Sequence, residues 1–240
     1  MTSTLKINTI EPEGATTNLA IGESGQDVIL PGNDLRANVL QDAGGNAIFT
    51  SDGSGNVTST VLGSSMVLLS TQTASDSASI SFTSDIDSTY DEYIFYFTNI
   101  NTASDGVQFM FQINAVGETG YNEPMTTTYM YAYNQESGTF YGLHYEQGNA
   151  QYNGTAYQYN AVQMGNEADQ NANGEFHLFN PSSTIYVKNW YARFSNLTAD
   201  NTARQQITAG YINVTAAIDD IQFKPGSGNF DGTIKMYGVK

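Results

Sequence analysis

The sequence contains no cysteine and few basic residues. Without cysteine the chain can form no disulfide, zinc–thiolate site, iron–sulfur cluster or thiol nucleophile. Lysine and arginine number 8 against 24 aspartate and glutamate residues, so the formal net charge is −16. Proteins that bind nucleic acid need clustered cations to neutralise phosphates, and residues 37–187 contain none. We therefore expect no nucleic-acid partner and no attachment to an anionic membrane surface.

Long apolar segments are also missing. Apolar runs such as residues 66–69 are far shorter than the roughly 18 residues that a membrane-spanning helix needs. The N-terminus has no basic segment followed by an apolar run, so it predicts no secretory signal peptide. The sequence thus predicts a protein without membrane insertion that is not exported by a cleavable signal.

The residues that are abundant favour β-structure. Charged residues make up only 13% of the chain, so its polar surface comes from Asn, Thr, Ser, Gln and Gly, which favour turns and strands over helices. Aromatic residues make up 12%, with 16 Tyr and 12 Phe, which is enough to bury a large core. This composition predicts an all-β fold.

Residues 1–62 differ from the rest of the chain and contain a single aromatic residue, Phe49. Residues 42–48 are echoed ten positions later by residues 52–58, each with a Gly-Asn turn signal next to a short apolar segment. Strands this short cannot bury an apolar face alone and need neighbouring repeats or chains. We predict an N-terminal assembly and attachment arm ordered by other chains, within a homotrimer; a flexible Gly/Ser-rich arm is the alternative.

Residues 63–240 predict an antiparallel β-sandwich with jelly-roll-like strand order. Alternating or continuous apolar runs are bounded by turn residues throughout this region. The runs at 93–97 and 108–111 are the most apolar and are expected to be central strands. The expected strands are residues 67–71, 78–83, 93–100, 107–116, 127–133, 174–179, 185–197, 207–217, 220–223 and 233–239.

The strand pattern weakens in a polar, tyrosine-rich insertion at about residues 121–160. Tyrosine rings offer an apolar face and a hydroxyl at little entropic cost, which is typical of recognition surfaces. The alternative is that these tyrosines cover the solvated face of a hairpin or form a trimer contact. We predict a glycan-binding face here, formed by Tyr129, Tyr131, Tyr133, Tyr141 and Tyr145.

Little in the sequence predicts catalysis. His144 and His177 have no local partner, and no nucleophile elbow, metalloprotease or phosphate-binding motif is present. The acidic residues within 85–92 and at 219–220 are weak candidates for a glycosidase pair or a calcium site, and we expect them to be solvated surface instead. Trp190 is expected to lie in the core. The chain is predicted to be no enzyme and to bind no cofactor or metal.

Three segments resemble known virion proteins. Residues 3–10 (Ser-Thr-Leu-Lys-Ile-Asn-Thr-Ile), residues 228–240 and the middle segment 66–97 resemble tail-fibre and other appendage proteins of marine tailed phages, especially those of cyanobacteria. The resemblance implies a trimeric virion structural protein that is assembled in the host cytoplasm and located in the virion. It would attach to other virion proteins through residues 1–62 and contact a host surface glycan through its β-domain. A capsid decoration protein and a short polysaccharide depolymerase are the alternatives.

Overall fold

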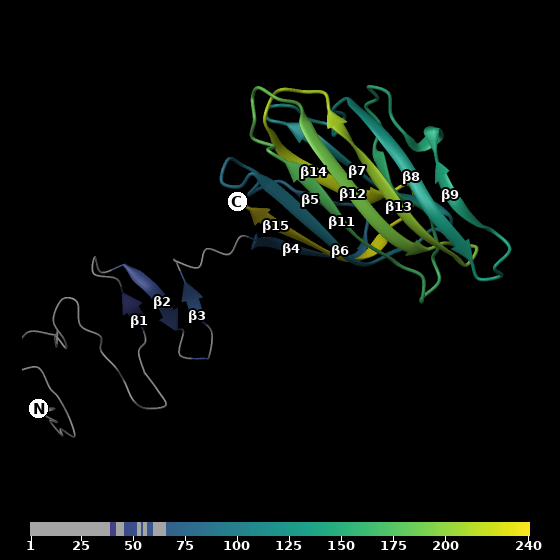
Figure 1. Cartoon of the computed structure of the whole chain (residues 1–240), viewed down its shortest axis with the longest axis horizontal. Helices are drawn as coiled ribbons and strands as arrows, with labels where there is room; N and C mark the ends of the chain where they lie inside the picture. Colours follow the sequence, from purple (N-terminus) through teal and green to yellow (C-terminus); the bar gives the residue numbers. More distant parts are fainter. Residues whose placement is uncertain (1–38, 42–45, 52–53, 55–56, 60–65) are drawn as a thin grey trace, which may run out of the picture. The chain divides into compact units, whose positions relative to one another are not determined.

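The computed structural model describes residues 39–41, 46–51, 54, 57–59 and 66–240 (Figure 1). The chain divides into two compact units, residues 1–63 and 64–240. In the first unit, β1 (Val39–Gln41), β2 (Ala47–Ser51) and β3 (Val57–Ser59) form an antiparallel sheet in the order β1-β2-β3. Short strands therefore occur in the echoed region. The rest of the predicted arm lies outside the described residues.

The second unit is built from two antiparallel sheets, a larger one of eight strands and a smaller one of four. The larger sheet contains, in spatial order, β4 (Met66–Ser77), β15 (Phe230–Val239), β6 (Glu92–Thr102), β11 (Ala172–Phe179), β12 (Lys188–Leu197), β13 (Thr202–Ile212), β8 (Met125–Gln135) and β9 (Tyr141–Tyr145). The smaller sheet contains β10 (Gln158–Met164), β7 (Val107–Ala115), β14 (Ile218–Pro225) and β5 (Ile80–Phe82).

The chain crosses repeatedly between the two sheets, which confirms the predicted all-β sandwich. β5, β7, β10 and β14 each lie in the smaller sheet between segments that belong to the larger one. The only helical element among the described residues is a single 3-10 turn, η1 (Gln147–Asn149), between β9 and β10. The described residues include no helix long and apolar enough to cross a bilayer.

Every predicted strand overlaps an observed one, but two strands are additional. β9 and β10 both lie within or beside the tyrosine-rich insertion, where polar residues interrupt the apolar alternation. β9 is an edge strand with exposed side chains on both faces, so no buried face marks it in the sequence. β10 buries the polar residues Gln158 and Asn160 as well as Ala161, Val162 and Met164, so its buried residues do not form a continuous apolar pattern in the sequence.

The core is a cluster of aromatic rings between the two sheets. Phe223 of β14 and Phe111 of β7 project from the smaller sheet onto Phe95, Phe97 and Phe176 of the larger one. Trp190 is 2% exposed, and its ring centroid lies 4.6 Å from that of Phe111. The expectation that Trp190 belongs to the core is confirmed.

Tyr93 belongs to this core, and its buried hydroxyl makes the stability of the fold depend on pH in the alkaline range. Its ring is completely buried, its hydroxyl donates to the Asp87 carbonyl (3.1 Å), and it accepts from the Asp87 N–H (2.8 Å). Burial raises the pKa of Tyr93 from its usual 10.0 to about 12. The unfolded chain therefore releases this proton at lower pH than the folded chain, so the contribution of Tyr93 to stability is lost as pH rises from 10 to 12.

We expect Tyr93→Phe to remove this part of the pH dependence. The variant is less stable than the parent protein at neutral pH, because the Asp87 N–H loses its acceptor. The difference in free energy of unfolding between the two proteins should shrink as pH rises from about 10 to about 12. Urea titrations of both proteins across this range measure it, and a constant difference would contradict the assignment.

Candidate functional site

The outer face of the eight-stranded sheet is the broad surface that the sandwich leaves uncovered. Along β12, Lys188, Trp190, Ala192 and Phe194 point inward and are buried, so the alternate residues point outward. The opposite side of the molecule differs, because loops cover part of the smaller sheet. There the amide of buried Gln112 donates to the carbonyls of Glu123 (3.1 Å), Thr155 (3.2 Å) and Ala156 (3.1 Å).

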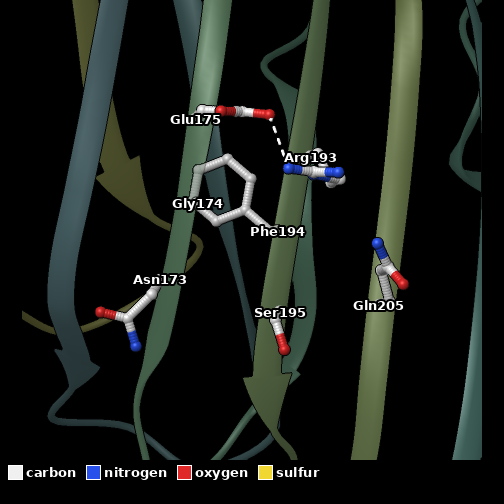
Figure 2. Close-up of a pocket in the computed structure, with 7 residues that line it drawn as sticks. All are labelled: Asn173, Gly174, Glu175, Arg193, Phe194, Ser195 and Gln205. Carbon is white, nitrogen blue, oxygen red and sulfur yellow. Dashed lines mark ion pairs between the residues drawn. The ribbon is translucent and has the colours of Figure 1, made fainter.

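A polar hollow of about 400 Å³ lies on this outer face, over β11, β12 and β13 (Figure 2). Arg193 Nη2 lies 3.0 Å from Glu175 Oε1 and forms an ion pair across β11 and β12. Asn173 is held in place because its Oδ1 accepts from the Asn99 N–H at 2.9 Å. Within the described part of the chain, no side-chain hydrogen bond involves Ser195 or Gln205. The lining residues are Asn173, Gly174, Glu175, Arg193, Phe194, Ser195 and Gln205.

A second, more apolar hollow of about 490 Å³ lies beside the first. Ala209 is small, and the cross-strand pairs Tyr191–Ala209 and Ala209–Thr128 leave a depression between larger neighbours. Gly210 brings β13 close to β8, because a Cβ at this residue would lie 2.4 Å from the Thr126 carbonyl oxygen. The lining residues are Thr126, Thr127, Thr128, Phe179, Asn189, Trp190, Tyr191, Ala209, Gly210 and Tyr211.

A hydrogen-bonded and stacked group of side chains connects the two hollows. His177 Nδ1 lies 2.5 Å from Glu92 Oε1, and its Nε2 lies 3.9 Å from Glu175 Oε2. The imidazole is parallel to the ring of Tyr191, at 4.3 Å between centroids and 13° between planes. This stack and the pair between Glu175 and Arg193 fix the side chains that separate the hollows.

Tyr191 is the most exposed aromatic side chain of this group, at 38%. Its pKa is raised above the usual value mainly by burial, with a further contribution from the charges of Glu175 and Glu92. At neutral pH the phenol therefore stays protonated and can donate a hydrogen bond. Arg193 and Tyr191 are consecutive outward residues of β12, about 7 Å apart along the strand. The two hollows are thus neighbours on one surface.

The sequence did not identify this site because its parts come from separate strands. The expectation that His177 lacks a local partner is wrong, because Glu175, two residues earlier in β11, lies 3.9 Å from it. Glu92 from β6 and Tyr191 from β12 also lie beside it in the sheet. A further signal was the outward alternation along β12 of Tyr191, Arg193 and Ser195, which indicates a solvated face but not its neighbours.

The five tyrosines predicted to bind glycan do not share one face. Tyr129, Tyr131 and Tyr133 lie on the inner side of β8, as the two-residue period predicts, but Tyr129 is completely buried and offers no surface to a ligand. In the register of β8 with β9, Tyr141 and Tyr145 pair with Asn134 and Met130, on the opposite side of the sheet. The expectation that all five tyrosines face one ligand is therefore incorrect.

Tyr131 and Tyr133 belong to a cluster of rings on β8, at the edge of the larger sheet next to β9. The Arg204 guanidinium carbon lies 4.4 Å from the centroid of the Tyr131 ring, and the His144 ring lies 5.5 Å from it. The ring centroids of Tyr133 and Phe140 lie 4.5 Å apart, and their planes are tilted by 38°. These rings are partly buried by one another, and a role for them in binding glycan stays a prediction.

Asp85 and Asp87 lie in a turn, whereas Glu92 pairs with His177 and the pair Asp219 and Asp220 lies in β14. The Oδ1 of Asp87 accepts from the Thr89 N–H at 2.7 Å, which lowers the pKa of its carboxyl group. Asp85 accepts from the Ser84 hydroxyl at 2.9 Å. Burial, followed by the neighbouring charge of Asp220, raises the pKa of Asp219. Over the residues that the structure describes, no group of three or more His, Asp and Glu side chains is arranged to hold a metal ion.

Comparisons with known proteins give no relative for this chain. No protein-family model, no curated protein and no solved structure matches it.

Proposed function

We propose that the chain is a structural subunit of a phage tail fibre or related virion appendage, and that its β-sandwich binds a host surface glycan. The observation that carries the binding role is the pair of adjacent hollows on the outer face of the larger sheet. One presents carboxylate, guanidinium, amide and hydroxyl groups, and the other presents aromatic rings. Sugars combine apolar ring faces with many hydroxyls, so they need both kinds of surface at neighbouring positions.

The chemistry of each hollow supports a neutral or weakly charged sugar as ligand. In the polar hollow, Glu175 and Arg193 neutralise one another while keeping hydrogen-bonding capacity toward solvent. Ser195 and Gln205 add a hydroxyl and an amide from neighbouring strands. In the apolar hollow, Tyr191 and Tyr211 provide rings beside the exposed amide of Asn189. Both hollows are open, which suits part of a longer polysaccharide.

The virion role is supported by the resemblance of three segments and by the organisation of the chain. Along the chain, a unit with short, echoed strands precedes the β-sandwich, as a chain with separate assembly and binding segments would have. In this proposal residues 1–62 join other virion proteins and further copies of the chain. The copy number in purified particles tests it: a small multiple of three or six indicates a tail appendage, whereas hundreds indicate a capsid decoration protein.

The test of glycan binding begins with a glycan array, followed by titration of the best-bound oligosaccharide. Tyr191→Ala is expected to weaken binding about thirtyfold, corresponding to about 2 kcal/mol for an aromatic anchor. Tyr186→Ala is the matched control, because Tyr186 is 68% exposed but lines neither hollow. Equal affinity of the Tyr191→Ala and Tyr186→Ala variants, or no binding to any glycan, would contradict the proposal.

A further inference from the structure

β9 is an open edge of the larger sheet (Figure 1). It pairs with β8 on one side through a continuous antiparallel register, from Met130 opposite Tyr145 to Asn134 opposite Tyr141. No strand of the described chain pairs with its other side. An open edge can be extended by another strand, because its outward N–H and C=O groups have no partners in the sheet.

The hydrogen bonds that flank β9 show which backbone groups point outward. The Glu146 N–H donates to the Tyr129 carbonyl (2.9 Å), and the Gln135 N–H donates to the Phe140 carbonyl (2.8 Å). Since hydrogen-bonded pairs alternate along an antiparallel ladder, Gly142 and His144 direct their backbone groups toward β8. The backbone N–H and C=O groups of Tyr141, Leu143 and Tyr145 therefore point away from β8.

The same three residues carry large, exposed side chains. Tyr141 is 71% exposed, Leu143 is 78% exposed and Tyr145 is 52% exposed. Their side chains share the outer side of the sheet with Met130, which is 39% exposed. Natural edge strands commonly carry charged residues or proline that discourage pairing, and β9 contains neither. Both the backbone and the side chains of β9 are thus suited to pairing with an additional strand.

The sequence of β9 is nearly symmetric about Leu143. It reads Tyr-Gly-Leu-His-Tyr, so reversing it exchanges only Gly142 and His144. A two-fold interface requires a surface that is complementary to itself, and a symmetric edge strand in antiparallel pairing meets this requirement. We propose that β9 binds the β9 strand of a second copy of this chain, antiparallel and centred on Leu143, joining two larger sheets into one.

In this pairing each outward residue meets an equivalent partner. Leu143 lies opposite Leu143 of the second copy, and Tyr141 lies opposite Tyr145 at both ends. Each of these is a hydrogen-bonded pair, which exchanges two backbone hydrogen bonds. His144 meets Gly142 of the second copy on the side of the sheet where the Tyr133 ring of that copy packs over Gly142. No carboxylate of the strand is brought against another, which matters in a chain of net charge −16.

This inference does not depend on glycan binding. The paired edge lies at β9, whereas the two hollows lie over β8 and β11–β13. It also differs from the predicted homotrimer, which residues 1–62 would form. If both contacts exist, the β9 contact links chains of different trimers, or two of the three chains in one trimer.

Site-specific cross-linking in the full chain tests the pairing, because the natural sequence contains no cysteine. In a hydrogen-bonded antiparallel pair the Cα atoms are about 5.5 Å apart, within the range that a disulfide spans. Leu143→Cys should therefore oxidise to a covalent two-chain species at least about tenfold faster than Ile185→Cys. Ile185 is a suitable control, since it is 73% exposed and lies outside β9.

The register gives a second, independent readout. A mixture of Tyr141→Cys and Tyr145→Cys proteins should form mixed two-chain species faster than either protein forms a disulfide with itself. Circular dichroism checks that each variant is folded. If Leu143→Cys oxidises no faster than Ile185→Cys, or if the mixture shows no preference for the mixed species, the two-fold pairing of β9 is wrong.

Discussion

Replacing Phe223 with alanine is expected to lower the free energy of unfolding by about 3–5 kcal/mol. Phe223 is completely buried in β14 and stands at the centre of the aromatic core. Its ring centroid lies 4.9 Å from Phe97, 5.4 Å from Phe95 and 6.0 Å from Phe176, all in the larger sheet. Within the smaller sheet it also lies 6.4 Å from each of Phe82, Phe109 and Phe111.

The size of the effect follows from the position of Phe223 between the two sheets. Removing its ring eliminates six ring contacts and leaves a cavity that close-packed sheets can fill only in part. The rings that line this cavity belong to continuous strand ladders, so they cannot move inward without breaking backbone hydrogen bonds. Both the lost burial and the unfilled volume therefore contribute to the loss of stability.

Phe140→Ala is the matched control. Phe140 is 49% exposed, and its described ring contact is with Tyr133 at 4.5 Å. The same substitution there should cost less than about 1 kcal/mol. Urea titrations of the parent protein and both variants give the comparison. Similar losses for Phe223→Ala and Phe140→Ala would mean that the sandwich is not held together by this aromatic core.

The sequence predicts the fold well where one face of a strand is buried. In β12, Trp190, Ala192 and Phe194 are buried and alternate with the exposed Tyr191 and Arg193. This alternation predicts both the strand and which of its faces is buried. The continuous apolar runs of β6 and β7 predict strands with neighbours on both sides, and each has two neighbours in its sheet. In these segments local pattern and tertiary burial agree.

Prediction fails where polar residues form the interior or where an edge is solvated. Gln158 and Asn160 are completely buried in β10 beside Ala161 and Met164, so polar residues interrupt the apolar pattern of this strand. The candidate site also could not be predicted from the sequence. Glu175 and His177 share one face of β11 through the two-residue period, but Glu92 reaches His177 only because β6 and β11 adopt one particular register. No local pattern specifies which residues of two distant segments become neighbours.

The buried polar residues at the β10 end of the sandwich carry the second large prediction. Gln206 of β13 accepts hydrogen bonds through Oε1 from the Tyr129 hydroxyl and from the Val162 N–H, the latter at 2.7 Å. Its Nε2 donates to Asn196 Oδ1 at 2.5 Å. Asn196 in turn donates to the Val162 carbonyl at 3.3 Å. One amide thus connects β8, β12 and β13 of the larger sheet with β10 of the smaller one.

We expect Gln206→Leu to lower the free energy of unfolding by about 3 kcal/mol or more. Leucine fills a similar volume, so the loss comes from hydrogen bonding and not from a cavity. It leaves the Tyr129 hydroxyl, the Val162 N–H and Asn196 Oδ1 without a partner inside the protein, and each such group costs about 1–3 kcal/mol. Part of this cost is recovered if strands shift to admit solvent.

A double-variant cycle separates the hydrogen bond from packing. Tyr129→Phe removes the hydroxyl that would be left unpaired, so combining it with Gln206→Leu should destabilise the protein by less than the sum of the single variants. Additive losses would show that Tyr129 and Gln206 do not interact.

Asn160→Leu provides the contrasting case in the same region. Asn160 is completely buried, yet neither its Nδ2 nor its Oδ1 has a hydrogen-bond partner in the protein. Replacing it with leucine removes two unpaired polar atoms while preserving volume, so the variant should be at least as stable as the parent. Both substitutions exchange a completely buried amide side chain for leucine. Comparing them therefore separates the cost of burying an amide from the hydrogen bonds that offset this cost. If Gln206→Leu and Asn160→Leu lowered the free energy of unfolding equally, the hydrogen bonds of Gln206 would contribute no net stability to this sandwich.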